Sequence, residues 1–357
     1  MEGSMGKKRV AVVGYGGMGG WHVKKIQVSD VVELAGIWDI KEERREIARE
    51  KEIHVYKSYE DLLADPTVEI VTVAVPNECH LPLSVQAMKA GKNVISEKPV
   101  AMNSGELAEM IACSEKTGKV FSVHQNRRWD CDFLMMKQVY ESGELGEVFN
   151  IESRVHGSRG IPGDWRGKKE HGGGMILDWG VHLIDQMLQI VRDKKIEKLY
   201  CRCDHVTNYE VDDGFKLDIY FEKELTARIE VGTSNFISMP RWYMLGANGS
   251  AMVEGWKSDC RIVSCKNWDE KNVVPVVTAA GLTKTMAPRD ENTIVESSIA
   301  RPESDVHDYY RNFCATIDGA ATQIVTHKQM MRVMKIMEAC FRSDELGVPV
   351  EIDDEIC

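Results

Sequence analysis

Several features that would assign this chain of 357 residues to a membrane, a secretory or a nucleic-acid function are missing from its sequence. No apolar run approaches the roughly 20 residues that span a bilayer. The apolar stretch 10–13, which follows three basic residues, is too short for a secretion signal. The net charge of −11 offers no positive patch to a nucleic acid or an anionic lipid surface. We therefore expect a cytoplasmic protein with neither a nucleic acid nor a membrane as partner.

Paired cysteines are also missing. The ten cysteines are scattered, with no C-x-x-C pair and none of the spacings of zinc fingers. Cys201 and Cys203 would share one face of a strand, but free thiols in a reducing compartment are the usual state of such residues. The sequence predicts neither a disulfide framework nor a metal site.

The first third of the chain alternates strand and helix patterns. The runs expected as strands are 9–13, 31–38, 54–56, 70–75, 93–96 and 120–123, and the expected helices are 18–28, 41–51, one starting at 58, 81–90 and 104–117. Strands that alternate with helices of roughly 10–15 residues imply right-handed crossovers. This region, placed at residues 6–126, therefore predicts an α/β domain with a doubly wound parallel sheet.

After about residue 126 the pattern changes to amphipathic helices followed by period-two runs, which suit an antiparallel sheet with one covered face. The expected helices are 133–142 and 175–191, and the clearest period-two runs are 216–221 and 226–231. Residues 266–303 are irregular and polar and are expected to form a long excursion. A closing helix at 328–342 could pack back on the first domain. We assign 127–357 to this second, α+β domain.

A glycine-rich run, 14–19, follows the first expected strand and opens the first expected helix. It has the form G-x-G-x-x-G, and Asp39 ends the second strand 20 residues after Gly19. A lone G-x-G-x-x-G arises by chance in many chains, but this context is typical of dinucleotide binding. The alternative is a surface turn and an unrelated solvated acid.

Each part of this motif has a physical role. Gly14 allows the tight turn, Gly16 lets backbone N–H groups approach phosphates, and Gly19 permits close helix–strand packing. The helix N-terminus favours an anion. Asp39 would accept hydrogen bonds from ribose hydroxyls and repel a 2′-phosphate, so we expect NAD rather than NADP. The cofactor-binding residues expected here are Gly14, Gly16, Gly17, Met18, Gly19, Asp39 and Ile40.

A second part of the cofactor site is expected after the strand at 70–75, at the sheet edge where open α/β sheets bind ligands. Pro76 fixes the exit of that strand, so that Asn77 and His80 can face the cofactor. His80 by itself would more often cap a helix or pack in the interior. The residues expected to contact the cofactor here are Ala74, Val75, Pro76, Asn77 and His80.

Two further islands carry chemistry. Lys98, within Glu97-Lys98-Pro99, ends the next strand, and Asp178 and His182 lie four residues apart, on one face of a helix. Histidine is suited to taking a hydroxyl proton at neutral pH, and an ammonium group stabilises a developing alkoxide. Lys98 could instead accept the proton. The plain alternatives are a solvated lysine, a helix-terminal acid and a packed histidine.

With these motifs in place, the chain strongly resembles the Gfo/Idh/MocA oxidoreductases, the family of glucose–fructose oxidoreductase and inositol dehydrogenase. The matching stretches are 12–22, 73–80, 90–99, 126–129, 143–147 and 172–182. The resemblance implies a Rossmann domain followed by a domain with a large open sheet. It also implies that Lys98 bridges nicotinamide and substrate, that Asp178 and His182 complete the site, and that the protein is a homo-oligomer (dimer, tetramer or higher).

The same resemblance extends the two ligand sites. It adds Glu97, Lys98 and Asn126 to the cofactor contacts. It places Lys98, Asp178, His182 and the segment Trp165-Arg166 around the substrate. Two further substrate candidates are Arg127, which begins the second domain, and His156, which departs from the family pattern.

These expectations describe an NAD(P)-dependent oxidoreductase acting on CH–OH groups. The reaction expected is NAD-dependent oxidation of a secondary hydroxyl of a sugar, a glycoside or an inositol to a ketone. One alternative is an NAD-dependent glycosidase that oxidises C3 transiently. Another is a non-catalytic regulator that senses NAD and sugar, although such a protein need not keep Lys98, Asp178 and His182.

Overall fold

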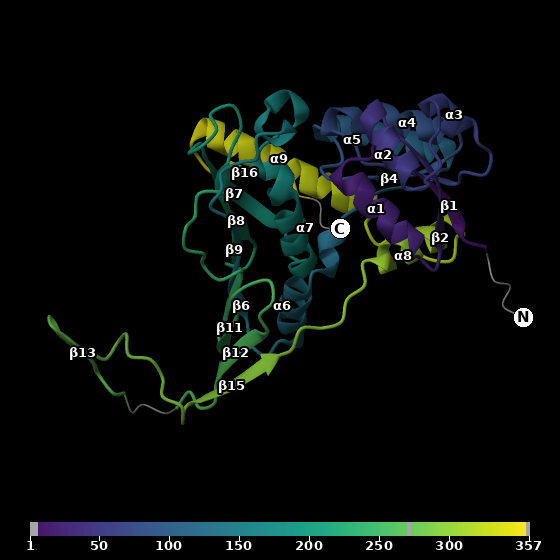
Figure 1. Cartoon of the computed structure of the whole chain (residues 1–357). Helices are drawn as coiled ribbons and strands as arrows, with labels where there is room; N and C mark the ends of the chain where they lie inside the picture. Colours follow the sequence, from purple (N-terminus) through teal and green to yellow (C-terminus); the bar gives the residue numbers. More distant parts are fainter. Residues whose placement is uncertain (1–5, 270–272, 355–357) are drawn as a thin grey trace, which may run out of the picture.

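Two large β-sheets, with helices that run between them, and a small two-stranded hairpin make up the computed structural model of the described part of the chain (Figure 1). The structure describes residues 6–269 and 273–354. No helix in these two stretches is long and apolar enough to cross a membrane.

The N-terminal sheet has five parallel strands in the order β2-β1-β3-β4-β5. Its strands are β1 (Lys8–Val13), β2 (Val32–Trp38), β3 (Ile70–Val73), β4 (Asn93–Ser96) and β5 (Phe121–Val123). Its helices are α1 (Gly17–Gln27), α2 (Glu42–Glu50), α3 (Tyr59–Ala64), α4 (His80–Lys89) and α5 (Ser104–Thr117). All residues of β3 and β4 are buried, as expected of strands covered on both faces. The parallel, doubly wound sheet predicted from the sequence is confirmed.

The strand expected at 54–56 is reduced to one residue. Val55 forms a single parallel bridge with Ile37 of β2, held by hydrogen bonds from the N–H of Ile37 to His54 O (2.9 Å) and from the N–H of Tyr56 to Ile37 O (3.0 Å). This bridge occupies the edge position beyond β2. Counting it, the strand order becomes the 3-2-1-4-5-6 order of dinucleotide-binding folds.

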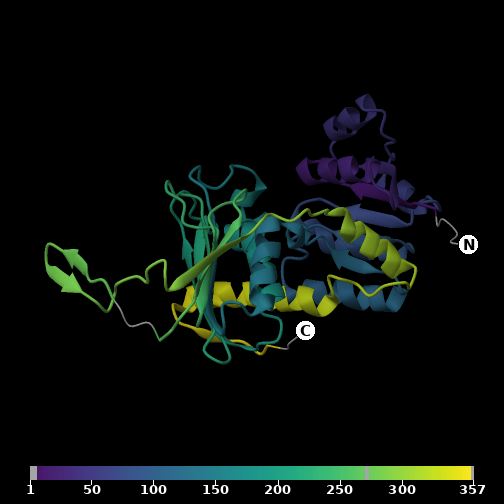
Figure 2. The same ribbon diagram turned by 90° about the horizontal axis from the view of Figure 1, so that it is seen from below.

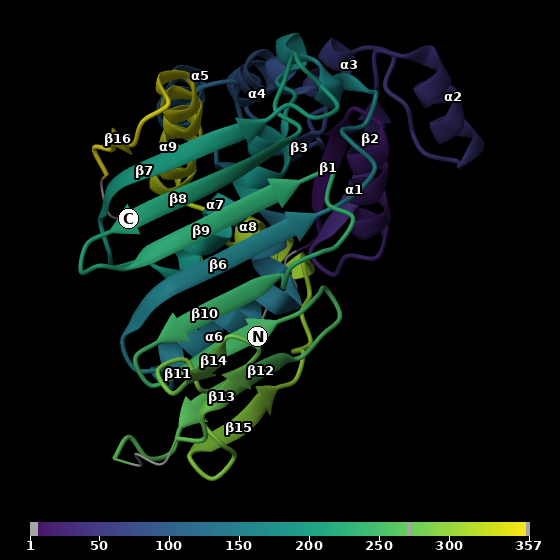
Figure 3. The same cartoon turned by 90° about the vertical axis from the view of Figure 1, so that its left-hand side faces the viewer.

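The second sheet has nine strands in the order β15-β12-β11-β10-β6-β9-β8-β7-β16, and every neighbouring pair except β6 and β9 is antiparallel. The strands are β6 (Val148–His156), β7 (Ile196–Asp204), β8 (Gly214–Phe221), β9 (Thr226–Gly232), β10 (Trp242–Gly246), β11 (Gly249–Val253), β12 (Cys260–Cys265), β15 (Ile294–Ile299) and β16 (Val350–Glu351). Helices α6 (Cys131–Ser142), α7 (Val181–Ile190) and α9 (His327–Leu346) pack on one face. In Figure 3 the opposite face carries no helix from the described part of the chain.

Two segments differ from the sequence expectation. The helix expected at 175–191 begins with one π-helical turn, η5 (Ile176–Gly180), before α7 starts. The excursion expected at 266–303 is only partly irregular: it contains β15, which pairs with β12 at the sheet edge, and the hairpin β13 (Val276–Thr278) and β14 (Gly281–Thr283). Figure 2 shows this hairpin extending away from the sheet.

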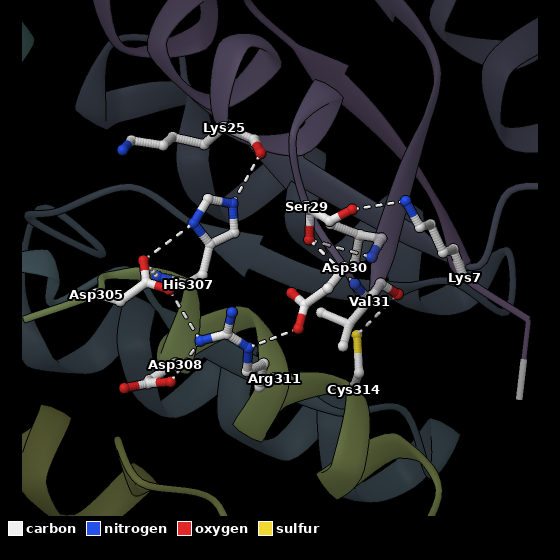
Figure 4. Close-up of polar contacts among 11 residues, drawn as sticks. Lys7, Lys25, Ser29, Asp30, Val31, Asp305, His307, Asp308, Arg311 and Cys314 are labelled. Atoms are coloured by element: carbon white, nitrogen blue, oxygen red, sulfur yellow. Dashed lines mark hydrogen bonds and ion pairs between the residues drawn. The ribbon is translucent and has the colours of Figure 1, made fainter. Parts of the chain in front are cut away.

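After β15 the chain returns to the N-terminal sheet. Helix α8 (His307–Ile317) docks on the end of α1, where His307 Nε2 lies 2.8 Å from Lys25 O and Arg311 Nε lies 2.8 Å from Asp30 Oδ2 (Figure 4). Helix α9 then contacts both β7 and α5, and Glu338 accepts hydrogen bonds from Ser104. The domain division at 126/127 stays a prediction.

Candidate active site

The glycine loop between β1 and α1 is shaped by close backbone contacts. Gly14 has a φ of +90°, and a Cβ there would lie 2.3 Å from Ala74 O. A Cβ on Gly19 would lie 1.8 Å from Gly14 O. At Gly16 and Gly17, by contrast, a Cβ would meet no described heavy atom within 4 Å. The loop is therefore packed tightly behind and open in front of the α1 N-terminus, the arrangement that admits a pyrophosphate.

Asp39 closes this loop from the end of β2. Its Oδ2 accepts a hydrogen bond from the N–H of Tyr15 (2.7 Å) and its Oδ1 accepts one from the N–H of Lys41 (2.8 Å). Each carboxylate oxygen keeps a second lone pair for another donor. The adjacent Ile40 is 80% exposed. Asp39, which lies 20 residues after the glycine motif in the sequence, is therefore hydrogen-bonded directly to that motif.

The loop after β3 is tied to other parts of the protein. The side-chain amide of Asn77, in the short turn η1 (Asn77–Cys79), donates to Gly172 O at 2.9 Å. The buried ring of His80 lies between Val75 O (3.0 Å) and Pro99 O (2.9 Å). These contacts fix the loop after β3, and the cofactor contacts of Asn77 and His80 stay a prediction.

Glu97 lies in a buried hydrogen-bond network at the end of β4. Its Oε1 accepts hydrogen bonds from His22 Nε2 (2.8 Å) and His124 Nδ1 (2.9 Å), and its Oε2 accepts one from the N–H of Lys98 (3.1 Å). Burial alone would raise the pKa of Glu97, but the hydrogen bonds from His124 and His22 outweigh it and hold that pKa well below its usual range. Glu97 therefore fixes the backbone that carries Lys98.

Sequence reasoning missed His22 and His124. The signal for His22 was its place three residues after Gly19, on the buried side of α1. The ligand atoms of His22, Glu97 and His124 lie within 4.8 Å of one another and are of types that bind metals. In this structure hydrogen bonds join both histidines to Glu97.

Lys98, which follows β4 of the first sheet, contacts Asp178, which lies in η5 against β9 of the second sheet. Lys98 Nζ lies 2.8 Å from both Asp178 Oδ1 and Asp178 O, and Arg166 Nε lies 3.1 Å from Asp178 Oδ2. Burial of Asp178 would raise its pKa, but the charges of Lys98 and Arg166 outweigh burial and lower that pKa. The carboxylate is therefore ionised and shared between two cations.

His182, in the first turn of α7, is 4% exposed. Its Nδ1 has no hydrogen-bond partner among the residues that the structure describes. Burial, followed by the nearby charges of Lys98 and Arg127, lowers the pKa of His182 well below its usual range. The imidazole is therefore uncharged at neutral pH and is a weaker base than a free histidine.

Asp212 sets the start of the turn that carries Asp178. Its Oδ2 accepts a hydrogen bond from the N–H of Ile176 (2.7 Å), and its carbonyl accepts one from the N–H of Met175 (3.0 Å). A Cβ on Gly174 would lie 2.2 Å from Asp212 Oδ1. Burial raises the pKa of Asp212 to about 7. No local motif connects Asp212 to this turn, and sequence reasoning missed it.

Helix α7 is anchored by further buried polar contacts. Asp185 accepts two hydrogen bonds from the guanidinium of Arg128 (2.7 and 2.6 Å), and Gln186 Nε2 donates to Arg127 O at 2.7 Å. Arg127 and Arg128 belong to η2 (Asn126–Trp129), the turn after β5. These bonds hold the end of the first sheet against the helix that bears His182.

A cleft of about 580 Å³ opens beside Trp179, in the η5 turn. The Arg127 guanidinium carbon lies 4.2 Å from the ring centre of Trp179 and 5.5 Å from that of Trp256, and the two indole centres are 5.9 Å apart. Residues lining the cleft are Arg127, Val155, His156, Gly157, Ser158, Arg159, Gly160, Met175, Trp179, Val231, Gly232, Thr233 and Trp256.

The remaining substrate candidates differ in position. His156 lines this cleft, but its Nδ1 accepts a hydrogen bond from the N–H of Met239 (3.2 Å) and its side chain is 2% exposed. Burial lowers the pKa of His156, so its ring is neutral. Trp165, in η3 (Trp165–Gly167), stacks on Arg166 at 4.6 Å. Sequence reasoning missed Trp256, which follows the strand β11 and carries no motif.

Comparison with known proteins identifies the family of the chain. A family model described as the oxidoreductase family with an NAD-binding Rossmann fold matches residues 8–125, and the GFO/IDH/MocA C-terminal domain matches residues 133–252. The chain is 27% identical to scyllo-inositol 2-dehydrogenase (NADP(+)) IolW of Bacillus subtilis, over 94% of each chain. It is 30% identical to inositol 2-dehydrogenase of Salmonella typhimurium, over 54% of this chain and 57% of that one.

A solved structure of an NAD-binding protein from Listeria innocua is similar over almost the whole length. The two chains are 41% identical, with a TM-score of 0.87 over 97% of each. The family models and the shared fold lead to one conclusion: the chain belongs to the GFO/IDH/MocA family of oxidoreductases.

Proposed function

We propose that this protein is an NAD-dependent dehydrogenase that oxidises a secondary hydroxyl of a sugar, a glycoside or an inositol to a ketone. The observation that carries the proposal is the Lys98–Asp178 pair, 2.8 Å between Nζ and Oδ1, beside the buried, neutral His182. An ammonium, a carboxylate and an imidazole next to a dinucleotide-type glycine loop are the groups that alcohol oxidation requires. Two relatives named as inositol dehydrogenases support this reaction class.

The three side chains divide the work. His182 takes the hydroxyl proton: its imidazole is uncharged, and because its pKa is lowered it accepts the proton as the hydride leaves and the hydroxyl becomes strongly acidic. The Lys98 ammonium stabilises the developing charge on the alcohol oxygen, a contribution of about 10²–10³ in rate for one such donor. Asp178 holds Lys98 Nζ in place and offers its remaining lone pairs to a substrate hydroxyl. The nicotinamide, when bound, supplies the hydride acceptor.

Replacing His182 distinguishes it from Lys98 as the proton acceptor. If His182 is the base, His182→Gln lowers kcat by about 10²–10⁴ while NAD affinity is kept. A His182→Gln enzyme with nearly unchanged kcat would assign the proton to Lys98 instead.

The residues at the glycine loop fit NAD. The open space in front of Gly16 and Gly17 leaves room for phosphates, and Asp39 presents a carboxylate beside the loop. A negative charge there disfavours a 2′-phosphate. The B. subtilis relative is named for NADP(+), so the ratio of kcat/KM for NAD to that for NADP is the direct test. We expect NAD to be preferred, and Asp39→Ser to reduce the preference.

The reaction is tested by offering the enzyme and NAD a panel of cyclic polyols and glycosides while NADH absorbance and ketone formation are followed. We expect NADH and ketone in equal amounts. Lys98→Met should bind NAD normally and lose turnover. Release of an aglycone without net NADH would identify a glycosidase, and NAD binding without any turnover would leave a regulator.

We also propose that the protein is a homo-oligomer that uses the helix-free face of the nine-stranded sheet (Figure 3). A sheet face that no element covers is a frequent site of self-association. Its ion pairs, such as Arg228–Asp218 (2.7 Å) and Arg261–Glu296 (2.5 Å), would be partly buried by a second copy. Light scattering with size-exclusion chromatography tests this, and a monomeric mass would contradict it.

A further inference from the structure

The cleft beside Trp179 has a charge opposite to that of the whole protein. Arg127 and Arg159 line it, and none of the residues that line it is Asp or Glu, although the chain carries a net charge of −11. In the described residues, lining side chains meet carboxylates at two points: Arg127 forms an ion pair with Asp130 (2.9 Å), and the neutral ring of His156 lies 3.4 Å from Glu230. Arg159 is exposed and takes part in neither of them.

The cleft also offers an apolar platform. The indoles of Trp179 and Trp256 lie side by side with the Arg127 guanidinium over both rings. This stacking holds Arg127 rigidly, which lowers the entropy lost when it binds a ligand. Flat aromatic faces next to a few fixed polar groups are typical of sites for ring-shaped small molecules.

The cleft adjoins the reaction centre. Trp179 follows Asp178 directly in the η5 turn, and its ring centre lies 6.1 Å from that of His182. The charge of Arg127 also acts on His182. A substrate whose hydroxyl reaches His182 and Lys98 can therefore extend into this cleft.

We infer that the cleft binds an anionic substituent, a carboxylate or a phosphate, carried by the ring that is oxidised. Arg159 is the side chain that recognises it, with Arg127 and the two indoles positioning the ring. The inference rests on the proposed dehydrogenase function, and it narrows the substrate to an acidic sugar or an acidic inositol. A guanidinium suits either anion because its donors match both in geometry.

The test compares matched neutral and anionic rings on the NAD-loaded enzyme. The pairs are glucose and glucuronate, galactose and galacturonate, glucose and glucose 6-phosphate, and myo-inositol and inositol 1-phosphate. Dissociation constants come from calorimetry, and KM comes from NADH formation. We expect at least one anionic member to bind about tenfold more tightly than its neutral partner, the effect of one charge-assisted hydrogen bond. Which pair responds tells carboxylate from phosphate.

Two variants locate the effect. Arg159→Gln should weaken binding of the preferred anion about tenfold and leave the neutral partner unchanged. The control Arg44→Gln, on the exposed side of α2, should change neither. If no anion binds better than its neutral partner, if a neutral disaccharide binds best, or if Arg159→Gln weakens both members equally, the inference is wrong.

Binding and turnover separate this inference from the proposed function. If the cleft binds anions selectively but no compound in the panel yields NADH, the assignment of the cleft holds and the proposed dehydrogenase activity is wrong. Turnover of neutral rings, with anionic rings neither bound more tightly nor oxidised, would sustain the dehydrogenase and overturn the cleft assignment.

Discussion

Lys98 and Asp178 are 2.8 Å apart, but the regions that supply them are held by different forces. Lys98 follows β4, in a sheet of apolar strands whose loops are shaped by glycine sterics and by the buried Glu97. Asp178 and His182 lie on η5 and α7, which are positioned by buried polar side chains from distant segments, Asp212 and Arg128 among them.

This difference determines how each region fails. The first region has little tolerance for an added Cβ where backbone meets backbone. The second is sensitive to the loss of one polar partner, because the remaining charge is left buried without compensation. Destabilising substitutions in the first region should therefore act through steric overlap, and those in the second through an unpaired buried charge.

The largest effect is expected at the anchor of α7. Asp185→Ala leaves the 7% exposed Arg128 without its carboxylate and should lower the free energy of unfolding by about 3–5 kcal/mol. Chemical denaturation measures it. The matched control is Glu141→Ala, which breaks the exposed pair with Lys137 on α6 and should not measurably move the midpoint. Equal effects in both variants would show that α7 does not depend on this anchor.

A smaller effect is expected in the glycine loop. A Cβ on Gly19 would lie 1.8 Å from Gly14 O. Because a backbone oxygen cannot rotate away as a side chain can, Gly19→Ala should lower the free energy of unfolding by about 3 kcal/mol. It should also weaken NAD binding. Its neighbour Gly20 has open space around a Cβ. Gly20→Ala should therefore raise stability by up to about 1 kcal/mol. Thermal melts of the pair test this, and a stable Gly19→Ala would contradict the steric account.

The same difference decides what the sequence could predict. The parallel sheet, the mainly antiparallel second sheet and the family were predicted correctly, because hydrophobic periodicity and contiguous motifs specify them. Lys98, Asp178 and the glycine loop were identifiable since each lies in a short run of characteristic residues. The structure brings Lys98 and Asp178 together and joins Asp39 to the glycine loop.

The long-range partners could not be predicted in this way. Asp212, His124 and Trp256 reach the site only because the chain folds, and no spacing in the sequence marks them. The sequence predicts one continuous helix where the structure has the π-helical turn η5 before α7. Over a single turn, an α-helix and a π-helix bury residues in the same pattern, so the sequence cannot distinguish them. Residues 54–56 have a strand's composition, but only Val55 pairs.

A still smaller change in stability is expected at Asp212, and it depends on pH. Its pKa of about 7 in the folded protein lies above the ordinary 3.8, so the unfolded chain releases this proton first as pH rises. The contribution of Asp212 to stability therefore falls between about pH 4 and pH 7. The full pKa difference is worth about 4 kcal/mol. We expect about half of it from Asp212→Asn, because the amide N–H groups need partners of their own.

Thermal melts at several pH values measure this change. Asp212→Asn should be less stable than the wild type by about 2 kcal/mol near pH 4, where only the cost of the amide counts, and more stable by about 2 kcal/mol at pH 8. A variant that is less stable at pH 8 would show that the charge on Asp212 favours the turn at Ile176 rather than opposing it.

The smallest effect on activity is expected from replacing Arg166, which contacts Asp178 where the two regions join. Arg166 helps to lower the pKa of Asp178, so Arg166→Gln should raise that pKa. As pH falls, Asp178 would then take up its proton earlier and release Lys98 earlier, and the acid limb of kcat/KM should move to higher pH. At pH 8 the loss should be only a few-fold, while Arg166→Lys should keep the wild-type profile. An unchanged acid limb in Arg166→Gln would mean that Lys98 alone keeps Asp178 ionised.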